Sequence, residues 1–137
     1  MGRVMGLDVG DRRIGIAVSD ETRLNATPHS VYTRVGWGPD TRHIRSLFEE
    51  LQCDLIVSGL PRNMDGSVGF QAEKVKQFMG KVAEAGMPVV FQDERLSTVS
   101  AHEALIAGGM KREERKGTVD KVAAAVILQQ YLDERRA

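Results

Sequence analysis

The sequence predicts an α/β fold in which helices cover the faces of a mixed β-sheet. Two short apolar runs near the N-terminus are separated by a tight turn, which predicts a β-hairpin. Further along, short apolar runs alternate with segments whose apolar residues recur every three or four positions, which predicts strands linked by crossover helices. The chain has 137 residues, of which 42% are hydrophobic. One domain spanning residues 1–137 is therefore expected.

The hairpin is predicted over residues 3–9 and 13–19, with Gly10-Asp11-Arg12-Arg13 as its turn. A third strand is predicted within residues 26–34. Pro28 cannot donate a hydrogen bond to a neighbouring strand, so this third strand is expected at the edge of the sheet.

Helices and strands then alternate to the C-terminus, and the boundaries follow from glycine, proline and capping residues. The first of these helices opens near Pro39 and has a buried face of apolar residues at helical spacing: Ile44, Leu47, Phe48 and Leu51. The later elements are a strand over 54–59, a helix from Ser67 to Gly86, a strand over 88–92, a helix from about Ser97 to Gly108, and a last helix capped by Thr118.

Composition excludes several classes of protein. Cys53 is the only cysteine, which excludes an internal disulfide and a cysteine-based metal site. No apolar run approaches the roughly 20 residues of a membrane-spanning helix. Met1-Gly2-Arg3 leads directly into a strand, so no signal peptide is expected. These features favour a cytoplasmic location.

Acidic residues stand at three places where a strand ends or a helix begins. Asp8 lies in an apolar strand, Asp93 and Glu94 follow another strand, and Asp120 is predicted in the first turn of the last helix. Neighbouring strand residues point to opposite faces, so spacing alone does not decide between Asp93 and Glu94. Each position also has a structural explanation, because Asp caps turns and acidic residues favour helix N-termini.

Carboxylates brought together from distant positions repel one another unless a cation joins them. Oxygen ligands of this kind bind Mg²⁺ or Mn²⁺. Metal ions held in this way can stabilise the attacking and leaving oxygens of a phosphodiester. The acidic pattern therefore predicts a metal-dependent nuclease.

Basic and polar residues near the acidic positions are candidates for binding nucleic acid, although the formal net charge is zero. A solvated charged loop explains the segment from Lys111 to Lys116 equally well. Trp37 lies in a glycine-rich segment and is by itself poor evidence for base stacking. The candidate contacts are Arg12, Arg13, Arg62, Asn63, Arg95, Lys111, Arg112 and Lys116.

Four blocks of sequence together resemble the YqgF/RuvX family. They are Gly6–Gly10 with Arg12–Asp20, then Gly59–Gly66, Asp93–Thr98 and Lys116–Ala124. The resemblance implies an RNase H-like fold, with a mixed five-stranded sheet flanked by helices. It also implies a nuclease that matures the 5′ end of pre-16S rRNA, with Asp8, Glu94 and Asp120 as catalytic metal ligands.

Other functions remain open at this point. A domain of the same fold could bind nucleic acid without cutting it, and a Holliday junction resolvase would act on branched DNA. An actin-like or sugar-kinase ATPase needs two such domains, for which 137 residues are too few. The choices between RNA and branched DNA, Mg²⁺ and Mn²⁺, and monomer and homodimer are also left open.

Overall fold

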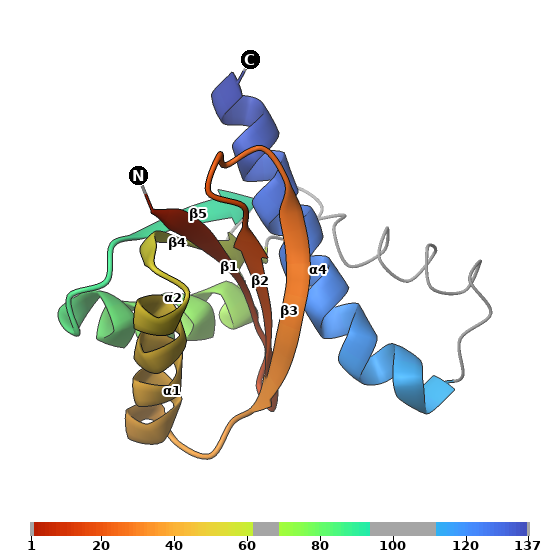
Figure 1. The fold of residues 1–137 in the computed structure, drawn as a ribbon. Coiled ribbons are helices and arrows are strands. Elements are labelled where there is room, and N and C mark those ends of the chain that lie inside the picture. Colours follow the sequence, from red (N-terminus) through yellow and green to blue (C-terminus); the bar gives the residue numbers. More distant parts are fainter. Residues whose placement is uncertain (1, 62–68, 94–111, 137) are drawn as a thin grey trace.

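The protein forms a five-stranded mixed sheet with helices on both faces, as a computed structural model shows (Figure 1). The structure describes residues 2–61, 69–93 and 112–136, and for residues 112–119 and 136 it describes the backbone alone. The elements are β1 (Arg3–Val9), β2 (Arg13–Ser19), β3 (Ala26–Thr33), α1 (Trp37–Glu50), β4 (Cys53–Leu60), α2 (Phe70–Glu84), β5 (Val89–Asp93) and α4 (Arg112–Arg136).

The strand order is β3-β2-β1-β4-β5. β1, β2 and β3 pair antiparallel, whereas β4 is parallel to β1 and β5 is parallel to β4. The predicted hairpin and the edge position of β3 are confirmed. Pro28 is accommodated where the register between β2 and β3 shifts, next to Ala17.

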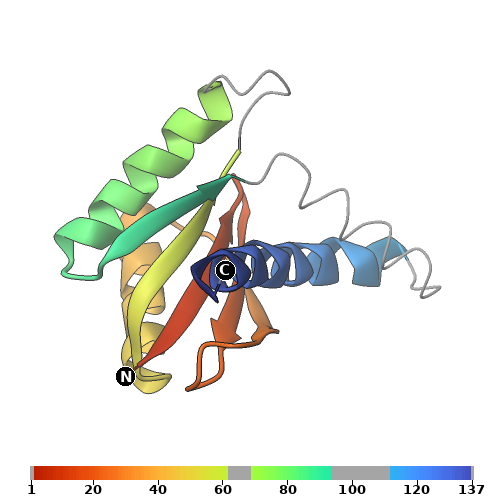
Figure 2. The ribbon, with the colours of Figure 1, turned by 90° about the horizontal axis from the view of Figure 1, so that it is seen from above.

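The two faces of the sheet are covered by different helices (Figure 2). Helices α1 and α2 cover one face, and the core between them and the sheet includes Leu7, Ile16 and Phe78. Helix α4 crosses the other face, where it packs on Val4 and Val57. Since successive strand residues point to opposite faces, each strand contributes side chains to both cores.

The last helix differs from its prediction. It begins at Arg112 rather than at Thr118, so Asp120 lies in its interior and not in its first turn. The basic residues Arg112 and Lys116, predicted in a loop, belong to this helix. Thr118 is a favourable N-cap residue, but Gly117 before it costs only about 1 kcal/mol inside a helix relative to alanine, and the flanking Arg, Glu and Lys residues favour helix.

Helix α2 also begins later than predicted, at Phe70, and its N-cap is Gly69 rather than Ser67. Among the residues that the structure describes, no side chain caps this end, and Gly69 is in an extended conformation. The helix predicted from Ser97 to Gly108 lies outside the described residues.

Within the described part of the chain, no helix combines the length and the apolar character needed to span a bilayer. Cys53 begins β4 and is half-buried beside the core under α1 and α2. Burial raises the pKa of its thiol to about 11. The thiol is therefore protonated and weakly nucleophilic at neutral pH, which agrees with a packing role.

Candidate functional site

Asp8 lies on the face of the sheet that is covered by α4, the helix that carries Asp120. On β1, a Cβ built on Gly6 would lie 2.8 Å from Cβ of Leu128 in α4, and Asp8 follows Gly6 by two positions on the same face. On β2, Gly15 is the register partner of Asp8.

Gly15 is also where α4 lies closest to the sheet. A Cβ built on Gly15 would overlap the carbonyl of Asp120 and lie 2.9 Å from the backbone nitrogen of Lys121. The absence of a side chain at this position therefore lets the backbone of Asp120 rest on the strand next to Asp8. Asp120 thus lies in the part of α4 that packs on the neighbouring strand of Asp8, and the metal-ligand roles of both residues stay predictions.

Arg13 joins the same cluster. Its Nε lies 2.9 Å from Oδ2 of Asp120, and the two side chains are 39% and 24% exposed. Arg13 precedes Gly15 by two positions and so points to the same face of β2. The guanidinium compensates the negative charge of a carboxylate that α4 turns toward the sheet.

The structure separates Asp93 from this cluster. Asp93 is the register partner of Leu60, which belongs to the core under α1 and α2. The neighbouring Gln92 instead donates a hydrogen bond from Nε2 to Glu134 of α4, at 3.1 Å. The side chain of Asp93 therefore points away from the face that carries Asp8. Glu94, the predicted third ligand, lies outside the described residues.

No group of three or more His, Cys, Asp or Glu side chains with metal-binding geometry occurs among the residues that the structure describes. Asp8 and Asp120 supply two carboxylates from distant segments. The third predicted ligand, Glu94, lies outside the described residues. The donor set fits a hard divalent cation, since both groups are oxygen ligands.

Of the predicted nucleic-acid contacts, the structure describes the side chains of Arg12 and Arg13. Arg12 is exposed in the turn between β1 and β2, beside the carboxylate cluster. Arg112 and Lys116 are described only as part of the α4 backbone. Arg62, Asn63, Arg95 and Lys111 lie outside the described residues.

The turn that follows Asp8 is fixed by Arg34, whose role the sequence did not indicate. The side chain of Arg34 donates from Nη1 to the carbonyl of Gly10 at 2.8 Å, and its guanidinium lies 4.7 Å from the ring centroid of Phe78. Its backbone N–H donates to the carbonyl of Arg12. Arg34 thus ties the turn to α2 and restricts the position of the strand end that carries Asp8.

Asp40, in the first turn of α1, holds Arg34 in place. Its carboxylate is fully buried and accepts hydrogen bonds from Arg34 Nε at 3.1 Å and from the backbone of Val35 and Gly36 at 2.9 and 3.3 Å. Burial by itself would raise the pKa of Asp40, but the hydrogen bonds from Val35, Arg34 and Gly36 outweigh it and lower the pKa below 3.8.

Replacing Asp40 by Asn is expected to destabilise the fold by about 3–5 kcal/mol at pH 6, because Arg34 then loses its buried counter-charge. The folded pKa of Asp40 is below its unfolded value, so its contribution is present above the unfolded pKa and is lost as pH falls through the folded one. Urea unfolding of the wild-type and Asp40→Asn proteins between pH 6 and pH 3 measures the contribution of Asp40 to the free energy of unfolding. The difference in the free energy of unfolding should shrink toward pH 3, and a constant difference would contradict the assignment.

A family model described as "RuvX: Holliday junction resolvase" matches residues 2–134. A protein of Clostridioides difficile (strain 630) named "Putative pre-16S rRNA nuclease" is 49% identical over 133 residues, covering 96% of this chain and 94% of that protein. A protein of the same name from Halothermothrix orenii is 45% identical over 132 residues, covering 96% of this chain and 94% of its own.

Solved structures agree on the fold. RuvC of T. thermophilus in complex with a Holliday junction substrate matches with a TM-score of 0.59 at 19% identity, over 100% of this chain and 97% of that one. The fowlpox virus resolvase bound to Holliday junction DNA gives a TM-score of 0.56 at 12% identity, over 98% and 99% of the two chains. The predicted RNase H-like fold is confirmed, and this chain belongs to the RuvX family.

Proposed function

We propose that this protein is a metal-dependent nuclease that hydrolyses phosphodiester bonds in the precursor of 16S ribosomal RNA. The observation that carries the proposal is the packing of Asp120 on Gly15, the register partner of Asp8. A divalent cation would stabilise two carboxylates held close together at this point of the sheet. The names of relatives at 45–49% identity supply the substrate.

Asp8 and Asp120 would hold the metal together with Glu94. The choice of Glu94 over Asp93 rests on the family resemblance and on the position of Asp93 opposite the core residue Leu60. A divalent metal in such a site lowers the pKa of a bound water and stabilises charge on the phosphoryl oxygens. Mg²⁺ or Mn²⁺ suits oxygen ligands of this kind.

Arg13 and Arg12 have different parts in this proposal. Arg13 orients the Asp120 carboxylate through its ion pair. Arg12 is exposed in the turn and is free to approach a backbone phosphate next to the cleaved bond. Arg112 and Lys116 on α4, with Lys111, Arg62, Asn63 and Arg95, are further proposed contacts. Binding through such contacts weakens as salt concentration rises.

A second candidate is a resolvase that acts on branched DNA, which the description of the matching family favours. A backbone-reading site with few base contacts can accept either substrate. Cutting two strands symmetrically would require a homodimer, whereas processing one RNA strand needs only a monomer.

Cleavage of an end-labelled RNA that spans the 5′ end of 16S rRNA tests the proposal. Reactions with Mn²⁺, with Mg²⁺ and with EDTA should give products only where a metal is present. A four-way DNA junction assayed in parallel separates the two candidates. RNA binding without cleavage under any of these conditions would instead identify a binding module that does not cut.

A further inference from the structure

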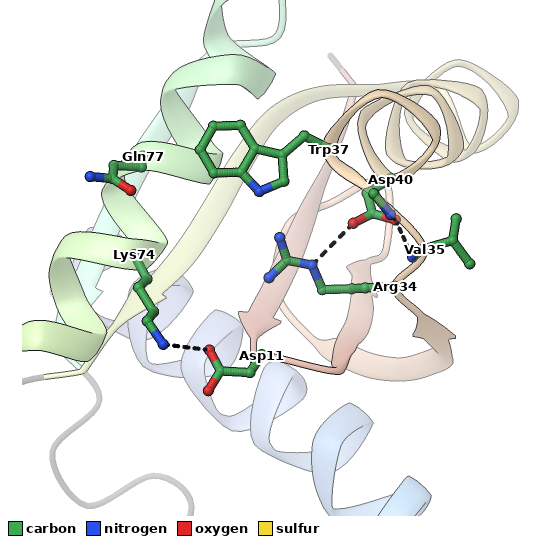
Figure 3. Close-up of a pocket in the computed structure, with 8 residues that line it drawn as sticks. Asp11, Arg34, Val35, Trp37, Asp40, Lys74 and Gln77 are labelled. Atoms are coloured by element: carbon green, nitrogen blue, oxygen red, sulfur yellow. Dashed lines mark hydrogen bonds and ion pairs between the residues drawn. The ribbon is translucent and has the colours of Figure 1, made fainter.

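A pocket of about 460 Å³ opens beside the Arg34–Asp40 pair (Figure 3). It lies between the start of α1, the middle of α2 and the turn between β1 and β2. Its lining residues are Asp11, Arg34, Val35, Gly36, Trp37, Asp40, Lys74 and Gln77. None of these residues belongs to the proposed catalytic site.

Trp37 gives the pocket an exposed aromatic wall. It is the first residue of α1, and 45% of its surface is accessible, which is unusual for the largest apolar side chain of a small domain. In Figure 3 the indole stands between the α2 side chains Lys74 and Gln77 and the Arg34–Asp40 pair. A planar ligand entering the pocket could therefore stack on the indole.

The charged groups in the pocket form pairs. Lys74 Nζ lies 3.4 Å from Asp11 Oδ1, and Arg34 Nε lies 3.1 Å from Asp40 Oδ2. Two cations and two anions make the pocket close to neutral, yet hydrogen-bond donors and acceptors remain at its walls, including the Gln77 amide. A phosphate would meet the Asp11 carboxylate there, whereas a neutral ring that carries both donors and acceptors would be accommodated.

The far side of Trp37 has a different charge. A second cavity of about 400 Å³ is lined by Trp37, Gly38, Thr41, Arg42 and Lys81. Arg42 and Lys81 are both cationic, and the ion pair of Lys81 with Glu84 is long, at 3.7 Å. Phosphate groups therefore have a suitable surface next to the neutral pocket, and Trp37 lines both cavities.

We propose that the pocket beside Trp37 binds an unpaired nucleobase of the nucleic acid strand on which the enzyme acts, while Arg42 and Lys81 contact the phosphates next to that base. The proposal rests on the proposed nuclease function and names a subsite for it. Stacking on an aromatic ring requires an accessible base face, so a single-stranded region is selected over a continuous duplex.

The pocket is close enough to Asp8 for one nucleic acid strand to occupy the pocket and the proposed catalytic site together. Asp11 follows Asp8 by three residues, so their Cα atoms are at most about 11 Å apart at 3.6 Å per residue. A strand with one base stacked on Trp37 would pass over the turn and its exposed Arg12 before it reaches Asp8. The base pocket would thereby hold the cleaved bond at a fixed position relative to the unpaired segment.

Trp37 is the only tryptophan in the chain, so its fluorescence reports on this pocket and on the neighbouring cavity that Trp37 also lines. A single-stranded RNA oligonucleotide should quench the emission in EDTA, and in Mg²⁺ when the non-cleaving Asp8→Asn protein is used. An oligonucleotide of the same length with abasic sites keeps the phosphates and should quench little. A duplex of the same length should also quench little.

Variants that keep Trp37 as the reporter test the pocket walls. Replacing Lys74 by Ala should weaken binding about tenfold, because it removes a hydrogen-bond donor from the pocket wall and the cation that pairs with Asp11. Lys76→Ala is the matched control, because Lys76 is exposed on the same helix but does not line the pocket. Trp37→Ala, followed by anisotropy of a labelled RNA, should show a loss at least as large as Lys74→Ala.

Equal quenching by the abasic and normal oligonucleotides, or no quenching under either condition, would overturn the proposal. So would equal losses for Lys74→Ala and Lys76→Ala. The nuclease proposal is tested separately: base-dependent quenching without any cleavage would support the pocket and contradict the catalytic function. Cleavage without a change in Trp37 emission would support the catalytic function and contradict the pocket proposal.

Discussion

Replacing Asp8 by Asn should reduce metal-dependent cleavage of RNA at least about 100-fold while the protein stays folded, since preorganised electrostatic groups contribute this much or more to catalysis. Asn retains the size of Asp and removes the negative charge that a divalent cation requires. Asp8 is half-buried at the end of β1, and its neighbour in register is a glycine. The substitution therefore creates no steric conflict, and removing a carboxylate near Asp120 relieves repulsion in the metal-free protein.

Metal binding gives a second measurement that does not depend on turnover. A cation present at 100 times its Kd stabilises the folded state by about 2.7 kcal/mol. Mn²⁺ should therefore raise the melting temperature of the wild-type protein and change that of the Asp8→Asn protein much less. Unchanged cleavage in the variant, with the same response to Mn²⁺, would remove Asp8 from the site.

Asp93 provides the matched control for the carboxylates. Asp93→Asn removes the same charge next to the proposed ligand Glu94, but Asp93 lies opposite Leu60 on the face that α1 and α2 cover. We expect Asp93→Asn to cleave within a few-fold of wild type and Glu94→Gln to be as impaired as Asp8→Asn. The reverse result would assign the third ligand to Asp93.

Local sequence patterns were sufficient for the sheet. The hairpin, the edge strand with Pro28 and the parallel strands follow from short apolar runs and from the restrictions that proline places on strands. The predicted start of α4 at Thr118 was wrong: Thr is a favourable N-cap residue, but the Arg, Glu and Lys residues before it favour helix and one glycine does not end it. A single capping residue is a weak guide to where a helix begins.

The sequence identified the acidic residues but not the contacts that position them. The contact between Gly15 and Asp120 joins residues more than 100 positions apart and depends on the register of β1 and β2. The tie formed by Arg34 and Asp40 likewise depends on the path from β3 into α1. The lone Trp37 became informative only when Lys74 and Gln77 of α2 were found beside it.

Replacing Gly15 by Ala should disrupt the site without touching a charged group. The added methyl would overlap the carbonyl of Asp120, and the conflict is with helix backbone, which cannot rotate away as a side chain could. Overpacking of this kind costs about 1–3 kcal/mol or more. Helix α4 must shift away from β2, and a displacement of about 1 Å at a catalytic group can reduce the rate about 100-fold.

Two glycine variants make this result specific. Gly80→Ala is the control, because nothing lies within 4 Å of a Cβ at this position in α2, and alanine should stabilise the helix by about 0.5–1 kcal/mol. Gly6→Ala places a methyl 2.8 Å from Cβ of Leu128, farther along α4 from Asp120. Stability in urea and the rate of RNA cleavage should both be highest for Gly80→Ala, lower for Gly6→Ala and lowest for Gly15→Ala. If Gly15→Ala instead unfolds and cleaves as the wild-type protein does, α4 does not rest on β2 at Asp120, and the proposed pairing of Asp8 with Asp120 loses its structural basis.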